Sequence, residues 1–160
     1  SGPETVFVIT SPCDIIIASA CLPEDRILWL IEHKRHEDAL AEITKSRSML
    51  KDQEISTFHA QIVSQMLSAT GDNSSVDAAK TLPRICGKDV SKWEKFVALF
   101  EEAGALTAIV DVIPVDKPLL SPATYDRLIS KLLIADADRF LSLVRSLPST
   151  AFDIKAAIDA

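Results

Sequence analysis

The spacing of hydrophobic residues divides the chain into two parts. In the first twenty residues, β-branched and aromatic residues form two short runs, at 5–9 and 14–18, separated by the turn-forming residues Thr10–Cys13. This pattern predicts two β-strands. Because two strands alone are only marginally stable in water, we interpret them either as the tail of a β domain upstream or as a hairpin packed on the first helix.

From Leu22 onward the apolar residues recur with the period of an α-helix. The first helix is expected to begin near Pro23, because proline fits the first turn and the acidic residues that follow it favour the positive end of the helix dipole. Its apolar stripe, including two flanking residues that widen it, is Ile27, Leu28, Trp29, Leu30 and Ile31.

The same spacing predicts further helices along the rest of the chain. Gly104, Pro114 and Pro118 are placed to end helices, whereas Ser121–Pro122 and Asp136 are placed to begin them. The apolar residues of the successive segments are Ala39, Leu40 and Ile43; Phe58, Ile62, Met66 and Leu67; 76–85; Trp93, Phe96, Val97 and Phe100; Leu106, Ile109, Val110 and Ile113; Tyr125, Leu128, Ile129, Leu132 and Leu133; Phe140, Val144 and Leu147; and Ile154 and Ile158.

Short polar turns between these segments indicate antiparallel helix pairs that recur irregularly, roughly every 30 to 40 residues. Each pair has an apolar face that only its neighbours can bury. The sequence therefore predicts an all-α fold, an α-solenoid of antiparallel helical hairpins (TPR-like or clathrin-repeat-like) over residues 21–160. A short β-strand segment over residues 1–20 precedes it, and residues 1–3 are interpreted as an expression scar.

The composition of the chain excludes several classes of function. The 17 basic and 23 acidic residues give a net charge of −6, which argues against nucleic acid as a partner. Only 4 of the 160 residues are glycine, fewer than a Rossmann fold or a P-loop would need for its turns. The longest apolar stretch, 6–22, is too short to span a bilayer and is interrupted by Pro12 and Asp14, so no direct membrane insertion is expected.

The three cysteines, Cys13, Cys21 and Cys86, form no CxxC pair. Neither a zinc knuckle nor a thioredoxin-type site is supported. We expect all three to be reduced, buried small hydrophobes of a cytosolic protein.

The sequence contains no cluster of side chains typical of a catalytic or metal site. His33 and His36 fall in a polar turn, where a solvated helix connection explains them, and His59 is expected to be a partly buried or surface side chain. The adjacent acids at 24–25 and 101–102 are interpreted as helix-end and solvent-face charges. With none of the common catalytic motifs present, we expect no enzyme and no catalytic, cofactor-binding or metal site.

Two further features have alternative interpretations. The stripe Trp93, Phe96 and Phe100 is expected in the core, the alternative being a peptide-binding groove, and the basic residues Lys45, Arg47 and Lys51 are expected on a solvated face. The strands within 6–18, if exposed, would offer edges for association, so the chain could dimerise through them.

Many residues, in order along the chain, resemble the vacuolar protein sorting-associated protein 41 (Vps41) family. The resemblance covers about residues 10–160, and its first part is similar to the junction between the β-propeller and the helical region of that family. The residues that carry it are Ser11, Pro12 and Asp14–Ile16; Asp25–Ile27, Trp29, Leu30, Glu32, His33, Arg35, Glu37, Ala39 and Leu40; Ala78 and Ala79; Gly87–Asp89, Trp93 and Glu94; Phe100, Gly104 and Leu106; Ile113, Pro114, Pro118, Leu120, Ser121 and Tyr125; and Phe140, Leu141, Leu143–Arg145 and Pro148.

The resemblance implies a non-enzymatic scaffold. Members of this family are subunits of the HOPS complex, which tethers late endosomes, vacuoles or lysosomes before SNARE-driven fusion. They are also linked to the third adaptor-protein complex. Partners implied for the full-length protein are the other HOPS subunits, that adaptor complex, a Rab GTPase and SNAREs. The implied location is cytoplasmic, peripheral on late endosomal, vacuolar or lysosomal membranes. The family's RING-type zinc module would lie outside this chain, and no functional residue is transferred.

Two functions from different classes remain open. The first is a structural segment of a membrane tether, which acts by holding partner surfaces at fixed separations. The alternative is a helical-repeat adaptor that grips a linear peptide of a trafficking partner in its concave groove. A groove binder would work as an isolated segment, whereas a tether segment would need its assembly.

Overall fold

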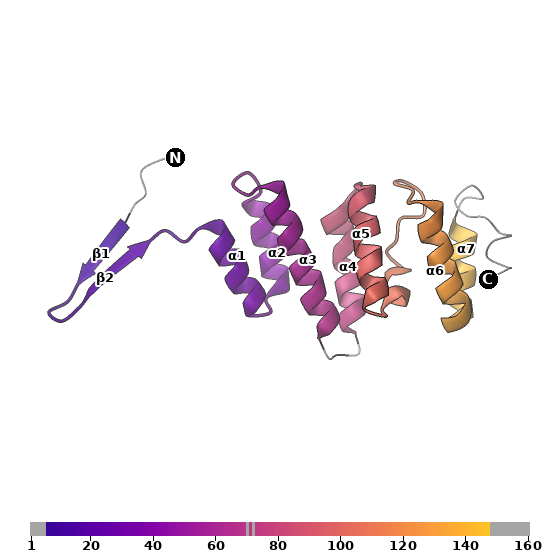
Figure 1. Cartoon of the computed structure of the whole chain (residues 1–160), viewed down its shortest axis with the longest axis horizontal. Coiled ribbons are helices and arrows are strands. Elements are labelled where there is room, and N and C mark those ends of the chain that lie inside the picture. The colour runs from indigo at the N-terminus through magenta and orange to yellow at the C-terminus, as the bar shows by residue number, and fades with distance from the viewer. Residues whose placement is uncertain (1–5, 70, 72, 148–160) are drawn as a thin grey trace. The chain divides into compact units, whose positions relative to one another are not determined.

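A computed structural model describes residues 6–69, 71 and 73–147, with the side chain of residue 19 left out. The described elements are two strands, seven α-helices and one 3₁₀ helix (Figure 1). Their bounds are β1 Val6–Thr10, β2 Ile15–Ser19, α1 Pro23–Glu32, α2 His36–Lys45, α3 Asp52–Ser68, α4 Ser74–Cys86, α5 Val90–Glu102, η1 Leu106–Ile109, α6 Pro122–Ala135 and α7 Ala137–Ser146. The final predicted helix, with Ile154 and Ile158, lies outside the described residues.

The predicted fold class is confirmed, since the helices follow a short antiparallel hairpin. Each predicted strand is shifted by one residue, to 6–10 and 15–19. In the turn between them, Ser11 N–H donates to Asp14 O at 2.8 Å, and the Ser11 hydroxyl accepts from the Asp14 N–H at 3.2 Å. The short polar side chain thus closes the turn that its position predicts.

By its internal contacts the chain divides into two compact units, residues 1–62 and 63–160, with the division inside α3. In the first unit α1 packs on α2, and their buried residues are Ile27, Leu30, Ile31, Ala39, Leu40 and Ile43. Lys34 has a left-handed φ of 57°, and the Arg35 N–H donates to Leu30 O at 2.9 Å. This Schellman-type reversal ends α1 and sends the chain back along it within three residues.

In the second unit the large aromatic side chains of α5 form the centre of the core. Trp93 is 2% exposed, and its Nε1 donates to Gly87 O at 3.1 Å. α5 contacts α4 and η1, and η1 contacts α6 in turn. Gly104, with φ 68°, ends α5, because the Ala105 N–H donates to Phe100 O at 2.9 Å in the same type of reversal. The predicted ending at Gly104 is therefore confirmed.

Helix starts in the second unit also follow the sequence. Asp136 caps α7, its carboxylate accepting from the Arg139 N–H at 3.1 Å. Ser121 and Pro122 begin α6 as predicted, although the Ser121 hydroxyl pairs with the Thr124 hydroxyl at 2.9 Å and makes no cap to the backbone. Buried Tyr125 then ties α6 to the preceding loop, because its hydroxyl donates to Pro114 O at 2.6 Å.

The helix predicted from the spacing of Leu106 and Ile113 is wrong. Only the four residues of η1 are helical, and they form a 3₁₀ helix. The Arg139 guanidinium donates to Thr107 O at 3.1 Å, the carbonyl that would accept from Asp111 N–H in an α-helix. The apolar residues of the segment are buried nonetheless, so their spacing reported burial and not an α-helical backbone.

We expect Trp93→Ala to lower the free energy of unfolding by about 3–5 kcal/mol, because it empties a fully packed site. Urea titration followed by circular dichroism at 222 nm measures the change. Trp29→Ala is the matched control. Because Trp29 is 48% exposed, this substitution should lower the free energy of unfolding by about 1 kcal/mol or less. Equal effects of the two substitutions would contradict the core assignment of Trp93.

Candidate interaction surfaces

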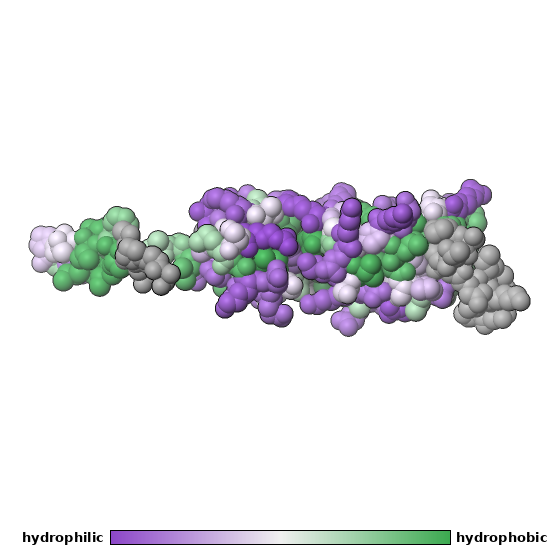
Figure 2. Space-filling view, turned by 90° about the horizontal axis from the view of Figure 1, so that it is seen from above, coloured by the Kyte–Doolittle hydropathy of each residue, from purple (hydrophilic) through white to green (hydrophobic). Residues whose placement is uncertain are grey.

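The β-hairpin is the most apolar exposed feature of the described chain. Figure 2 shows it as a hydrophobic surface, in contrast to the largely polar surface over the helices. Phe7 is 61% exposed and Ile17 is 70% exposed, and the other large apolar side chains of both strands are exposed as well. An exposed apolar sheet of this kind marks an association surface.

Both faces of the hairpin carry apolar side chains. The register pairs Phe7 with Ala18 and Ile9 with Ile16, and these residues share one face. Val8 pairs with Ile17 on the other face. A hairpin at the surface of a domain would alternate apolar and polar residues, so a sequence apolar on both faces is typical of strands covered on both sides.

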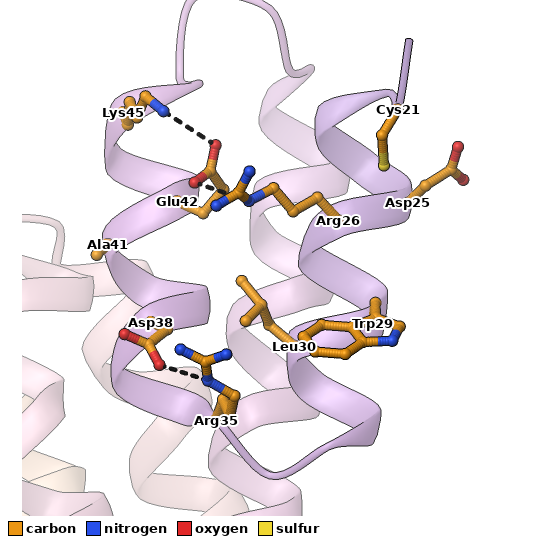
Figure 3. Close-up of a pocket in the computed structure, with 10 residues that line it drawn as sticks. All are labelled: Cys21, Asp25, Arg26, Trp29, Leu30, Arg35, Asp38, Ala41, Glu42 and Lys45. Carbon is orange, nitrogen blue, oxygen red and sulfur yellow. Dashed lines mark hydrogen bonds and ion pairs between the residues drawn. The ribbon is translucent and has the colours of Figure 1, made fainter. Parts of the chain in front are cut away.

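A groove lies between α1 and α2 (Figure 3), with a volume of about 630 Å³. α1 and the residues before it supply one wall, and α2 supplies the other. The lining residues are Cys21, Asp25, Arg26, Trp29, Leu30, Arg35, Asp38, Ala41, Glu42 and Lys45. They include three basic and three acidic side chains, so the groove as a whole carries no net charge.

Ion pairs hold the charged walls of the groove together. Arg26 Nε of α1 lies 3.3 Å from Glu42 Oε2 of α2, and Figure 3 shows this side chain crossing between the helices. Glu42 also accepts from the Ser46 hydroxyl at 3.2 Å and lies 3.8 Å from Lys45 Nζ. Arg35 Nε lies 2.7 Å from Asp38 Oδ2. Since the three basic side chains already have acidic partners, the groove suits a neutral surface better than a strongly charged ligand.

Trp29 is the largest exposed apolar side chain at this groove. Its ring stacks on His33, with 4.1 Å between ring centroids, and His33 Nδ1 lies 2.8 Å from Trp29 O. The prediction that Leu28 and Trp29 widen the buried stripe is wrong, because both are exposed. On a helix they lie 100° and 200° around the axis from Ile27, which takes them outside the buried stripe of Ile27, Leu30 and Ile31.

The candidate histidines do not come together. His33 is exposed at the end of α1, as predicted for a solvated connection, whereas His36 begins α2 instead of lying in the turn. His59 is buried within α3. Among the residues the structure describes, no group of three or more His, Cys, Asp or Glu side chains could hold a metal ion.

The cysteine prediction is right for Cys86 and wrong for the other two. Cys86 is buried at the end of α4, and this burial raises the pKa of its thiol to about 12. Cys13 and Cys21 are exposed, one in the hairpin turn and the other between β2 and α1. They lie outside the helical cores, where the tertiary structure offers nothing to cover them. All three are free thiols.

The remaining candidates behave as side chains of a helical scaffold. Trp93, Phe96 and Phe100 are buried, which confirms the core interpretation of this stripe. Lys45, Arg47 and Lys51 are exposed, as expected of a solvated face. Glu101 of α5 pairs with Arg127 of α6 at 3.0 Å, a link that adjacency in the sequence could not reveal. No helix in the described part of the chain combines the length and apolarity that a membrane crossing requires.

Comparison with known proteins identifies the helical part. The model of the Vps41 TPR-like region matches residues 59–160, which is more than half of the chain. The chain belongs to the Vps41 family. The resemblance noted from the sequence is thereby confirmed, and a TPR-like region agrees with the α-solenoid fold class of antiparallel helical hairpins.

Relatives in this family match the hairpin as well as the helices. The Vps41 homologue of Mus musculus is 30% identical over the whole of this chain, and that of Arabidopsis thaliana is 29% identical over the whole chain. The Vps41 protein of Schizosaccharomyces pombe is 23% identical over 92% of the chain. The chain spans only 18% of the length of the mouse protein and 16% of the other two. No solved structure matches the chain significantly.

We expect two thiols of the native chain to react rapidly with 5,5′-dithiobis(2-nitrobenzoate), because Cys13 and Cys21 are exposed. Cys86 should react only after unfolding, since its buried thiol is neither accessible nor ionised at pH 8. Absorbance at 412 nm in buffer and in guanidinium counts the thiols. The double variant Cys13→Ser/Cys21→Ser is the control and should show no rapid phase. Three rapid thiols in the native wild-type chain would contradict the burial of Cys86.

Proposed function

We propose that this chain is a non-enzymatic scaffold segment of a subunit of a membrane-tethering complex. The subunit acts in vacuolar protein sorting and in the fusion of endosomes or vesicles with the vacuole or lysosome. The observation that carries this proposal is the similarity of the entire chain to proteins named for vacuolar protein sorting. The segment contributes shape and exposed faces, as helical-hairpin arrays generally do.

The proposal includes a domain organisation. Residues 1–20 are the end of a β domain, a propeller in the interpretation drawn from the sequence, and residues 21–160 are the beginning of an α-solenoid. The hairpin that is apolar on both faces supports the first assignment, and the TPR-like match over 59–160 supports the second.

The partners of the full-length protein are other HOPS subunits, with the third adaptor-protein complex, a Rab GTPase and SNAREs as further partners. Its location is cytoplasmic, peripheral on late endosomal, vacuolar or lysosomal membranes. Because the chain covers 18% or less of its relatives, these contacts belong to the whole protein, and this segment carries a share of them.

We expect the chain, tagged at its C-terminus, to recover HOPS subunits from eukaryotic cytosol, as read by mass spectrometry. Leu128→Asp is the matched control: it places a charge in the core of α6 while leaving the exposed hairpin unchanged. Capture that depends on the folded helices is lost in this variant, whereas capture by the apolar hairpin persists.

Recovery of HOPS subunits with the wild-type chain and their loss with Leu128→Asp support the proposal. Recovery of none, from a chain shown to be helical, contradicts a tethering contact within these residues. The alternative function, an adaptor for a linear peptide, is favoured by the groove between α1 and α2. It predicts micromolar binding of a single peptide by the isolated chain.

We expect the isolated chain to form dimers through its hairpin, because among the described residues nothing pairs with the outer edge of either strand and both faces expose apolar side chains. Val8→Lys with Ile17→Lys places two charges on one of the two apolar faces and should weaken the association, which sedimentation velocity measures as a larger monomer fraction at a given concentration. Ile134→Lys, at an 89% exposed position of α6, is the control and should leave the association unchanged. A wild-type chain that stays monomeric at high concentration would rule out this association.

A further inference from the structure

The connection between the hairpin and the helices is short. Residues 20–22 alone join β2 to α1, and three extended residues span only about 10–11 Å. Along α1, Trp29 lies six residues after Pro23, a rise of about 9 Å. Whatever folds around β2 is therefore held within about 20 Å of Trp29, whereas a small domain is about 30 Å across.

The hairpin requires additional strands and covering layers. Its two strands have no further neighbours among the described residues, and its apolar side chains are exposed on both faces. The relatives align with the whole of this chain, hairpin included, and are more than five times its length. The polypeptide of these relatives thus has ample length outside the matched region to complete a β domain.

We propose that the groove between α1 and α2 is the docking site of a β domain that precedes α1 in the same polypeptide and has β1 and β2 as its last strands. This inference rests on the domain organisation proposed above. The hairpin lies before residues 20–22 and the groove is lined by residues around and after them. The domain that covers the hairpin then also covers Trp29.

The chemistry of the groove fits this occupant. Trp29 is half exposed yet held by its stacking on His33, so its ordering adds little entropic cost on binding, and tryptophan is enriched among residues that dominate binding energy. Leu22, in the connection immediately before α1, is exposed as well, although it does not line the groove. The pairs Arg26–Glu42 and Arg35–Asp38 supply a polar rim whose charges are already balanced, as suits the neutral surface of a sheet.

The test compares hydroxyl-radical footprints of two purified proteins: the 160-residue chain, and the full-length polypeptide that contains it together with the proposed β domain (the extended polypeptide). Mass spectrometry reads oxidation at Trp29, at Phe7 of the hairpin, and at Met49. Met49 is the internal control, because it is exposed between α2 and α3 and does not line the groove.

In the extended polypeptide we expect Trp29 and Phe7 to be oxidised several-fold more slowly than in the 160-residue chain at a concentration where that chain is monomeric, with Met49 unchanged. Trp29 oxidised at an equal rate in both proteins overturns the docking proposal. If Phe7 is protected in that case, the β domain exists and only its docking site is wrong. If Phe7 also stays reactive, the domain organisation fails as well. Protection of Trp29 without protection of Phe7 overturns the choice of occupant.

A variant series checks the same contact. In the extended polypeptide, Trp29→Ala should speed cleavage within residues 20–22 by proteinase K several-fold, and Trp29→Phe should restore much of the protection. Ile134→Ala is the matched control for loss of an exposed apolar side chain on a helix. Unchanged cleavage in Trp29→Ala, with the melting temperature of the 160-residue chain also unchanged, overturns the proposal.

Discussion

The packed helices of the described chain carry apolar stripes that neighbouring elements cover. α1 and α2 cover one another through Ile27, Leu30 and Leu40, whereas α5 is covered by α4 and η1 around Trp93. Polar links reinforce this packing from one element to the next, as Glu101 does with Arg127. Because these helices pack on neighbours close in the sequence, their contacts are local, as is typical of helical-repeat scaffolds.

The need to bury apolar surface also explains two exposed features, the hairpin and the groove beside α1. The hairpin has apolar side chains on both faces, and α1 presents Trp29 beside a groove of balanced charge. A three-residue connection joins them, so one adjoining domain could satisfy both demands together. The proposed function and the proposed docking site thus follow from a single principle, the burial of apolar surface, applied within the chain and then beyond it.

Most elements were predictable from the sequence because their signals are local. Gly104 ends α5 and Asp136 caps α7 through contacts within a few residues, and the stripe Trp93, Phe96 and Phe100 marks a buried face directly. The prediction failed for the segment from Leu106, which forms a 3₁₀ turn although its apolar spacing suits an α-helix. In this segment a residue distant in sequence, Arg139, donates to the carbonyl of Thr107, and no local pattern reveals such a contact.

The candidate surfaces also have some features that the sequence determines and others that only the tertiary structure decides. By itself the sequence determined the seven α-helices, the pairing of α1 with α2 and of α6 with α7, the apolar hairpin and the family, because periodicity, capping signals and residue order are local properties of the chain. Only the tertiary structure decided that Trp29 is exposed, that Cys21 is uncovered and that Arg26 crosses to Glu42. Exposure and ion pairing depend on which side of a helix its neighbour occupies, and that side is set by the packing of elements and not by the composition of any one of them.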